Sequence, residues 1–323
     1  MRIGIIGAGG QARVHAAAIQ AAGGGVELAA MAGRGRKALK RAAGEFGARP
    51  AESPAALIGD AAIDGVVLAC PTAQHREFAV AALEAGKHVL CEVPLAPLLE
   101  DADAMIAAAR KAGRVLMAGQ VLRHVAAYGR LREIVAGGEL GKTVAVSTTR
   151  LSPPYWAEGE SLAAAHHGDV VQEMLAFDVD VFNWLFGLPD RVWGAGKQSD
   201  GAFDHVHVGL RYGDVLVAAE ASVLLPRGST FATTLRLTCE GGLIELDFLL
   251  PKDAPVEMWF AETRSGGRQT PIEVEPVDPD VAQIREFKRL VEAGPADGAV
   301  AAEAARDTLD VCLRIDVALR SES

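Results

Sequence analysis

Residues 3–15 read Ile-Gly-Ile-Ile-Gly-Ala-Gly-Gly-Gln-Ala-Arg-Val-His. An apolar run typical of a buried strand leads directly into Gly7-x-Gly9-x-x-Ala12, and a helix-compatible segment follows. Gly7 allows a tight turn, Gly9 lets the backbone approach a pyrophosphate, and Ala12 is small enough for the helix to pack on the strand. The helix N-terminus would offer unpaired N–H groups and its positive dipole end to the phosphates. The stretch therefore predicts a dinucleotide site, with a purely structural tight turn as the alternative.

The first 120 residues alternate apolar strands with alanine-rich helices, and glycines follow the helices. Strands that are apolar throughout are typical of a parallel sheet covered on both faces. Strand–helix alternation with short connections predicts a doubly wound sheet. Gly86 and Gly113 stand where the end of a helix favours a left-handed residue. The predicted strands are 2–6, 26–32, 65–70, 88–91 and 115–118, and the predicted helices are 10–22, 35–46, 74–85 and 97–112.

Beyond residue 120 the pattern changes, and alternating strands dominate residues 191–276. Such alternation indicates an antiparallel sheet with one covered face. We therefore expect a dinucleotide-binding domain at 1–120 and, at 121–323, an α+β domain with a large open, mostly antiparallel sheet. The uncovered face has to pack on something, so we expect a homodimer or a homotetramer. The other elements predicted here are helices at 124–136, 170–186, 279–293 and 299–320 and a strand at 142–150.

Composition excludes several classes of protein. The formal net charge of −10 argues against a nucleic-acid partner, which needs a basic face. No apolar run approaches the ~18 residues of a membrane span, and the start of the chain shows no signal-peptide pattern. The scattered cysteines are typical of buried thiols in a cytoplasmic protein. These cysteines are Cys70, Cys91, Cys239 and Cys312.

Several short motifs follow the first one along the chain. They are Cys70-Pro71-Thr72-x-x-His75, Glu92-x-Pro94, Gly119-Gln120-x-x-Arg123, Gly137-x-Glu139-Leu140-Gly141 and a helical segment from Gly168 to Gly187.

Together with Gly7-x-Gly9-x-x-Ala12-x-x-His15, these motifs resemble the glucose–fructose oxidoreductase / inositol dehydrogenase family over nearly the whole chain. The resemblance implies a Rossmann domain followed by an open-sheet substrate domain, with the active site between them. It also implies hydride transfer between a nicotinamide and a sugar-like or cyclitol alcohol, that is, a small polyhydroxylated substrate. The residues expected to bind the cofactor are Gly7, Gly9, Gly10, Gln11, Ala12, Gly33, Arg34, Cys70, Pro71, Thr72, His75, Glu92, Val93 and Gln120.

The end of the second strand selects the nicotinamide. An acidic residue there would bind the ribose hydroxyls of NAD and repel a 2′-phosphate. This chain has Ala32-Gly33-Arg34-Gly35-Arg36-Lys37, with three cations and no carboxylate. A guanidinium suits a phosphate, whereas a cation at a helix N-terminus opposes the dipole. We therefore predict NADP rather than NAD, and the alternative is a solvated basic start of a helix.

The catalytic centre departs from the family pattern. Val93 stands where the family has the lysine of Glu-Lys-Pro, and Phe177 stands where its long helix has a histidine. Proton transfer from a hydroxyl still needs a partner, and Glu173 is the predicted replacement because partial desolvation would raise its pKa. The alternative is an ion-paired carboxylate on the helix face. The predicted substrate contacts are Arg123, Trp156, His167, Phe177 and Asp180.

The histidines do not predict a metal centre. Adjacent His166 and His167 point in different directions, and no third ligand stands at zinc spacing. His205 and His207 share one strand face, for which a sheet-face or subunit-contact role is the interpretation. We expect no metal.

Three functions fit these observations. The first is an NADP-dependent oxidoreductase acting on a sugar-like, cyclitol or cyclic hemiacetal substrate. The second is a catalytically inactive dinucleotide-binding sensor or partner protein, which the loss of the usual lysine and histidine favours. The third is a lyase or glycosidase that uses transient oxidation by a bound cofactor.

Overall fold

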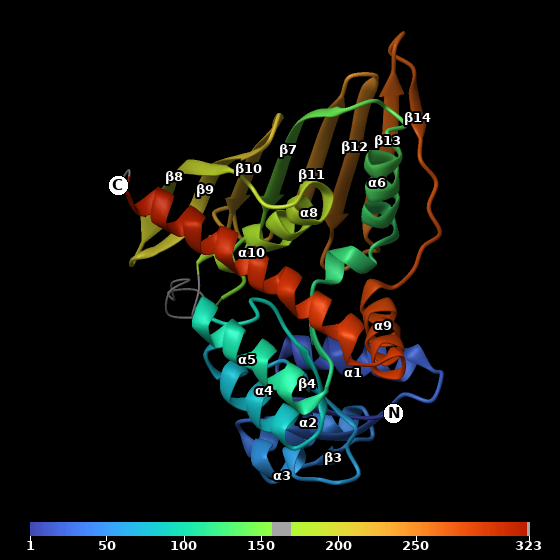
Figure 1. Cartoon of the computed structure of the whole chain (residues 1–323), viewed down its shortest axis with the longest axis vertical. Helices are drawn as coiled ribbons and strands as arrows, with labels where there is room; N and C mark the ends of the chain where they lie inside the picture. Colours follow the sequence, from blue (N-terminus) through green and yellow to red (C-terminus); the bar gives the residue numbers. More distant parts are fainter. Residues whose placement is uncertain (157–168, 322–323) are drawn as a thin grey trace. The chain divides into compact units, whose positions relative to one another are not determined.

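The computed structural model describes residues 1–156 and 169–321, and the chain divides into two compact units. The first unit comprises Met1–Val125 and Val277–Leu309, and the second comprises Ala126–Pro276 and Asp310–Ser323 (Figure 1). The first unit thus takes in a segment late in the chain, and its early part ends a few residues beyond the boundary expected at residue 120. Among the described residues, no helix has the length and apolar character that crossing a membrane requires.

The first unit contains a parallel six-stranded sheet in the order β3-β2-β1-β4-β5-β6. This is the strand order of a Rossmann fold, in which ligands bind beyond the carboxyl ends of the strands where the order reverses. The predicted doubly wound sheet is thus confirmed. Its strands are β1 (Arg2–Ile6), β2 (Glu27–Ala32), β3 (Arg49–Pro50), β4 (Gly65–Leu68), β5 (His88–Cys91) and β6 (Leu116–Ala118).

The predicted helices of the first 120 residues are all present within one or two residues. Gly113 follows its helix in the left-handed conformation, and Gly86 also has a positive φ. The short strand β3 and helix α3 were not predicted, although Ser53 caps α3 and Pro54 begins it, which is a readable signal. The helices are α1 (Gly10–Ala22), α2 (Arg36–Glu45), α3 (Pro54–Ile58), α4 (His75–Glu84) and α5 (Leu99–Ala112), with 3-10 turns η1 (Thr72–Gln74) and η2 (Val121–His124).

Helix α9 (Pro279–Ala293) explains why the first unit regains a late segment. Asp278 caps the helix by accepting from two backbone N–H groups. The buried Ile284 and Phe287 join the same core as Ile19 of α1, which lies beside α9. The sequence showed the apolar face of this helix but not which sheet it covers.

The second unit contains an eight-stranded sheet in the order β14-β13-β12-β11-β7-β10-β9-β8. Only the β7–β10 pair is parallel, so the predicted large, mostly antiparallel sheet is confirmed. The strands are β7 (Thr143–Leu151), β8 (Arg191–Ser199), β9 (Ala202–Tyr212), β10 (Val215–Ser222), β11 (Phe231–Cys239), β12 (Gly242–Leu250), β13 (Glu257–Arg264) and β14 (Gln269–Pro271).

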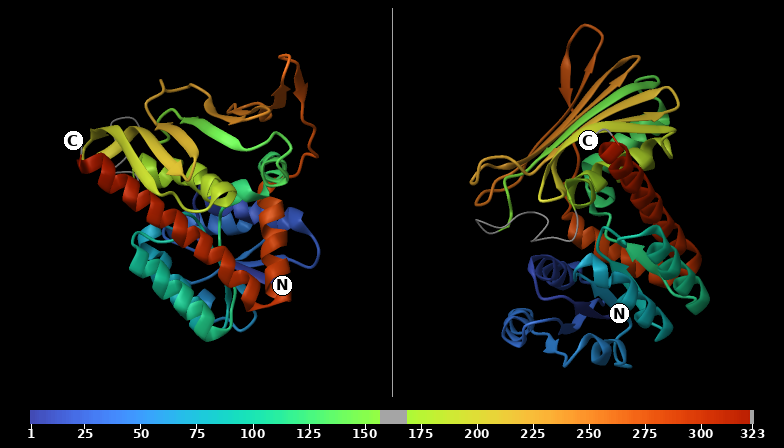
Figure 2. Two further views of the ribbon diagram at one scale, coloured as in Figure 1. Left: turned by 45° about the horizontal axis from the view of Figure 1, so that its top comes forward. Right: turned by 90° about the vertical axis from the view of Figure 1, so that its left-hand side faces the viewer.

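Helices α6 (Ala126–Gly137) and α8 (Ala176–Phe186) pack on one face of this sheet (Figure 2). Tyr128 of α6 stacks on Phe248 of β12 with ring centroids 6.0 Å apart. We call the opposite face, which carries Trp193, Leu216, Glu220 and Trp259 by strand register, the open face. The last helix, α10 (Pro295–Ser321), contributes residues to both units.

The long helix predicted at 170–186 does not begin as an α-helix. Val171–Leu175 form one π turn, η3, in which the N–H of Ala176 bonds to the carbonyl of Val171. A π turn inserts an extra residue and often marks a functional site. It also alters the register that a uniform helix would give between Glu173 and Phe177.

Candidate active site

The glycines after β1 shape the first part of the site. Gly7 has φ 148°, and a Cβ there would lie 2.2 Å from the carbonyl oxygen of Ala69 and 3.2 Å from the Cβ of Ala12. Gly9 has ordinary extended geometry, and no atom lies within 4 Å of the position its Cβ would take. The turn is therefore sterically closed at Gly7 and open at Gly9. These residues, with Gly10 at the start of α1, fit a pyrophosphate that approaches the helix N-terminus.

The loop after β2 carries Arg34, and Arg36 and Lys37 follow in the first turn of α2. Gly33 is half-buried against the first turn, and a Cβ there would lie 3.3 Å from Ala8. Arg34 is exposed and close enough to the thiol of Cys70 to act on it. Burial raises the pKa of Cys70 to about 11, and the positive charge of Arg34 opposes that shift. The structure thus brings together the loops after β2 and β4.

His75 joins two further loops at the same edge of the sheet. Its Nε2 lies 2.9 Å from the carbonyl oxygen of Cys70, and its Nδ1 lies 3.1 Å from that of Pro94. Burial lowers the pKa of His75, and a neutral imidazole has a single N–H, so one carbonyl accepts at a time. Buried with 1% of its surface exposed, His75 holds together the loops that carry Pro71, Thr72 and Val93.

Glu92 is held by three donors. Gln11 donates to its Oε1 at 2.8 Å, His15 binds the same oxygen, and the N–H of Val93 donates to Oε2 at 3.2 Å. Burial acts to raise the pKa of Glu92, but these hydrogen bonds and the His15 charge outweigh it and lower the pKa. A Cβ on Gly119 would lie 3.1 Å from Oε2. Glu92 and Gln11 therefore fix the β5 loop against α1, and the role of His15 was not read from the sequence.

The first unit ends with two further predicted residues. Gln120 is 7% exposed after β6, and Arg123 is half-buried in η2. His124 follows, and burial and the charge of Arg123 lower its pKa while Glu286 opposes the shift. Both predicted residues thus belong to the unit that carries the glycine turn.

In the second unit, the π turn carries Glu173. Burial raises the pKa of Glu173, and the negative charge of Asp169 raises it further. No hydrogen bond or ion pair joins its carboxylate to the residues in 1–156 and 169–321. The carboxylate of Asp169 instead accepts from the N–H of Val171 at 3.0 Å and so caps the turn. Glu173 is therefore desolvated and holds its proton more tightly than an exposed carboxylate does, in the direction that favours a general base.

Tyr155 lies near Glu173, and the sequence assigned it no role. Burial raises the pKa of its phenol, and the charge of Glu173 raises it further. Its ring makes an edge contact with the predicted substrate residue Trp156, with centroids 5.2 Å apart. The carbonyl of Trp156 accepts from Arg227 at 2.8 Å. The only sequence signal for this grouping was the irregular Pro-Pro-Tyr-Trp stretch, and the predicted His167 lies outside the described residues.

Phe177 covers a buried ion pair. Arg150 of β7 donates from Nε and Nη2 to the carboxylate of Asp178 at 2.7 and 3.0 Å, and its guanidinium lies 5.4 Å from the Phe177 ring centroid. Burial acts to lower the pKa of Arg150, but Asp178 outweighs it and raises the pKa. Asp180 is 3% exposed and near Cys312 of α10. Phe177 therefore presents an apolar, half-buried surface on the helix that carries Glu173.

Two family models match the chain in sequence order. Residues 1–120 match the oxidoreductase family with an NAD-binding Rossmann fold, and residues 128–245 match the GFO/IDH/MocA C-terminal domain. The chain belongs to the GFO/IDH/MocA oxidoreductase family, as the motifs predicted.

Two related enzymes are moderately similar to this chain in sequence. The 1,5-anhydro-D-fructose reductase of Ensifer adhaerens is 30% identical over 224 residues, which cover 67% of this chain and 66% of the relative. Inositol 2-dehydrogenase 2 of Saccharopolyspora erythraea is 32% identical over 190 residues, which cover 58% of this chain and 54% of the relative. The matches thus span 54% and 66% of these relatives' own lengths.

Solved structures agree with the fold. The aldose-aldose oxidoreductase of Caulobacter crescentus has a TM-score of 0.84 at 22% identity, covering 100% of this chain and 98% of that one. The UDP-N-acetylglucosamine 3-dehydrogenase of Acidithiobacillus ferrooxidans has a TM-score of 0.81 at 23% identity, covering 99% and 98%. At these identities the likeness establishes the two-domain fold alone.

Proposed function

We propose that this chain is a cytoplasmic, NADP-dependent oxidoreductase that transfers hydride between the nicotinamide and a sugar-like, cyclitol or cyclic hemiacetal substrate. Family membership and the names of its relatives support the reaction class. The four cysteines are free thiols, as expected in a reducing compartment. When bound, the cofactor would accept or donate the hydride, and residues of this chain would bind the reactants and move the hydroxyl proton.

The observation that carries this proposal is the state of Glu173. With Val93 and Phe177 at the usual lysine and histidine positions, a hydroxyl proton needs another acceptor. Glu173 is desolvated and has no ion-pair partner among the described residues, so its raised pKa suits it to accept that proton. A cyclic hemiacetal loses its hydroxyl proton more readily than an ordinary secondary alcohol, so it would suit a single carboxylate base.

NADP is proposed over NAD because of the loop after β2. The six residues from Ala32, where β2 ends, to Lys37, in the first turn of α2, include three cations and no carboxylate. Arg34 is exposed beside the loop that follows β4, as a contact to a 2′-phosphate requires. The planar guanidinium could also stack on the adenine. The proposed cofactor contacts are the glycine turn, Arg34, and the loops that His75 and Glu92 hold.

The open face supports a proposed homodimer or homotetramer. Trp193, Leu216 and Trp259 are 38%, 44% and 44% exposed on it. Large apolar side chains exposed on a sheet face favour a protein contact. Light scattering after size exclusion at micromolar concentration should give a dimer or tetramer, and a monomer would contradict the proposal.

The function is tested by supplying NADP⁺ and NAD⁺ with a panel of polyols, aldoses and lactols, and following reduced nicotinamide at 340 nm. We expect turnover of at least one ring substrate with NADP⁺. Tight NADPH binding without turnover on the whole panel would favour the inactive sensor. Nucleotide retained through purification, together with glycoside cleavage, would favour the lyase or glycosidase alternative.

A further inference from the structure

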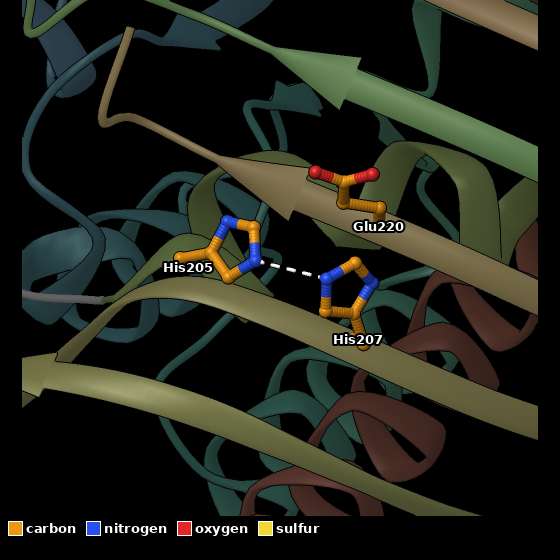
Figure 3. Close-up of side chains that lie close together, drawn as sticks. All are labelled: His205, His207 and Glu220. Atoms are coloured by element: carbon orange, nitrogen blue, oxygen red, sulfur yellow. Dashed lines mark hydrogen bonds between the residues drawn. The ribbon is translucent and has the colours of Figure 1, made fainter.

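Three metal-ligating side chains meet on the open face of the second unit. His205 and His207 lie on β9, and Glu220 lies on the neighbouring β10 (Figure 3). The antiparallel register places Glu220 directly opposite His207. One ligand atom from each of the three side chains lies within 4.8 Å of the other two. This group takes no part in the proposed oxidoreductase chemistry.

A β-bulge brings the two histidines to the open face. Lys197 of β8 pairs with His205 and Gln198 pairs with Phe203, so Asp204 is an extra residue. Because a bulge re-aims side chains, Phe203 is fully buried while His205 faces outward. Simple alternation would have placed Phe203 on the same face as the histidines.

The two imidazoles are spaced as ligands of one ion would be. Nε2 of His205 lies 3.1 Å from Nε2 of His207 (Figure 3). With Zn–N bonds of 2.0–2.1 Å in tetrahedral geometry, two coordinating nitrogens lie about 3.3 Å apart. Without an ion, one of the two nitrogens donates its N–H and the other accepts it, and a second proton between them would set two donors face to face. A metal ion uses both lone pairs.

Glu220 supplies the charge that a divalent ion needs. Its carboxylate is half-buried and has no hydrogen bond or ion pair with the described part of the chain. One of its oxygens lies within 4.8 Å of a ring nitrogen of each histidine. Lys197, opposite His205, is exposed, so its ammonium can turn into water.

We propose that His205, His207 and Glu220 bind one divalent transition-metal ion of the zinc class. Two imidazole nitrogens and one carboxylate oxygen suit zinc, cobalt or nickel rather than calcium or magnesium. Three protein ligands leave a fourth position for water or for a group from outside the described residues. The sequence alone disfavoured a metal because its third ligand stands on a different strand.

The test uses the whole chain, stripped with EDTA and returned to chelator-free buffer. Zn²⁺ is titrated by calorimetry, and Co²⁺ is titrated by its visible absorption. We expect one ion per chain and the intense bands of tetrahedral cobalt. Removing a residue that only contacts a metal ligand typically weakens metal binding about 10–100-fold. His207→Ala and Glu220→Gln each remove a proposed ligand, so each should weaken Zn²⁺ binding at least about 10-fold. Asp214→Asn, in the exposed turn between β9 and β10, is the matched control and should bind as the parent does.

Two results would overturn the proposal. One is a His205→Ala/His207→Ala variant that binds Zn²⁺ as the parent does. The other is loss of binding in a His166→Ala/His167→Ala variant, which would move the site to that pair. Circular dichroism and metal-free melting establish that each variant is folded, and the near-isosteric Glu220→Gln gives an answer even if a histidine variant fails to fold.

Discussion

The strand-end edge of the first unit and the π turn of the second unit each carry a half-buried carboxylate, but only the first carboxylate is hydrogen-bonded by described residues. At the first, Glu92 accepts three hydrogen bonds, and the N–H of Gly7 donates to the carbonyl of Ala32 at 2.7 Å on a backbone path that a Cβ would block. At the second, Glu173 is desolvated, and no described residue pairs with it. A satisfied network fixes a shape, whereas an unsatisfied carboxylate keeps its capacity to take a proton. The polar groups of the first region are therefore satisfied, whereas the second region keeps a carboxylate without a partner among the described residues.

The strongest test of this contrast compares two glycines. Gly7→Ala places a Cβ 2.2 Å from a backbone oxygen at a positive φ. We expect a loss of at least about 3 kcal/mol in stability, or about 6 °C in the unfolding midpoint. Gly9→Ala has free space and should melt as the parent does, while its NADPH affinity falls. Differential scanning calorimetry and NADPH fluorescence separate the two effects, and equal melting of both variants would refute the steric argument.

Glu173→Gln tests whether the carboxylate on the π turn acts as the proposed general base. Turnover should fall roughly 100-fold or more, with NADPH affinity nearly unchanged, as loss of a general base typically gives. In the parent, oxidation should speed up as pH rises through the raised pKa of Glu173, because the ionised form accepts the proton. The measurement is steady-state kinetics as a function of pH. The control variant is Glu133→Gln, which removes an exposed carboxylate on α6. Parental turnover in Glu173→Gln would shift attention to Tyr155.

Arg34→Asp tests whether the strand-end edge of the first unit binds the 2′-phosphate of NADP. A charge-assisted contact contributes about 1.5–3 kcal/mol, so NADPH affinity should fall about 10-fold or more and NADH should become the tighter ligand. Lys40→Asp, farther along α2, makes the same charge change and should keep the parental order. Fluorescence titration with NADPH and NADH measures both affinities. If the parent binds the two nucleotides equally tightly, Arg34 does not select the cofactor.

The smallest predicted effect is on stability. Burial raises the pKa of Glu173, so the folded chain binds this proton more tightly than the unfolded chain does. Its stabilising contribution is complete below the unfolded pKa of about 4.3 and is lost as pH rises through the folded pKa. Glu173→Gln should therefore melt about 2 °C higher than the parent at pH 8, with the difference closing near pH 4. A variant that melts lower at pH 8 would show that the ionised carboxylate is stabilised in the fold.

Much of the first unit could be predicted because its signals are local. The small Ala12 and the apolar strands depend on neighbours a few residues away, and the glycine pattern marks the turn at Gly7 even though the carbonyl oxygen that a Cβ would meet there belongs to Ala69. The cations after β2, and the replacements at Val93 and Phe177, are likewise plain in the sequence. Which core receives α9 was not predictable, because its apolar face would suit either sheet.

The sequence by itself determined the doubly wound sheet, the glycine turn, the cations that follow β2, and the presence of Glu173 near the departure from the family pattern at Phe177. Only the tertiary structure decided that His15 and Glu92, far apart in the chain, share one hydrogen bond. It also decided that Glu173 stands on a π turn and that a bulge turns His205 toward Glu220. The physical reason is that backbone sterics act between near neighbours, whereas strand register, bulges and burial are set by partners that the chain meets only once it is folded.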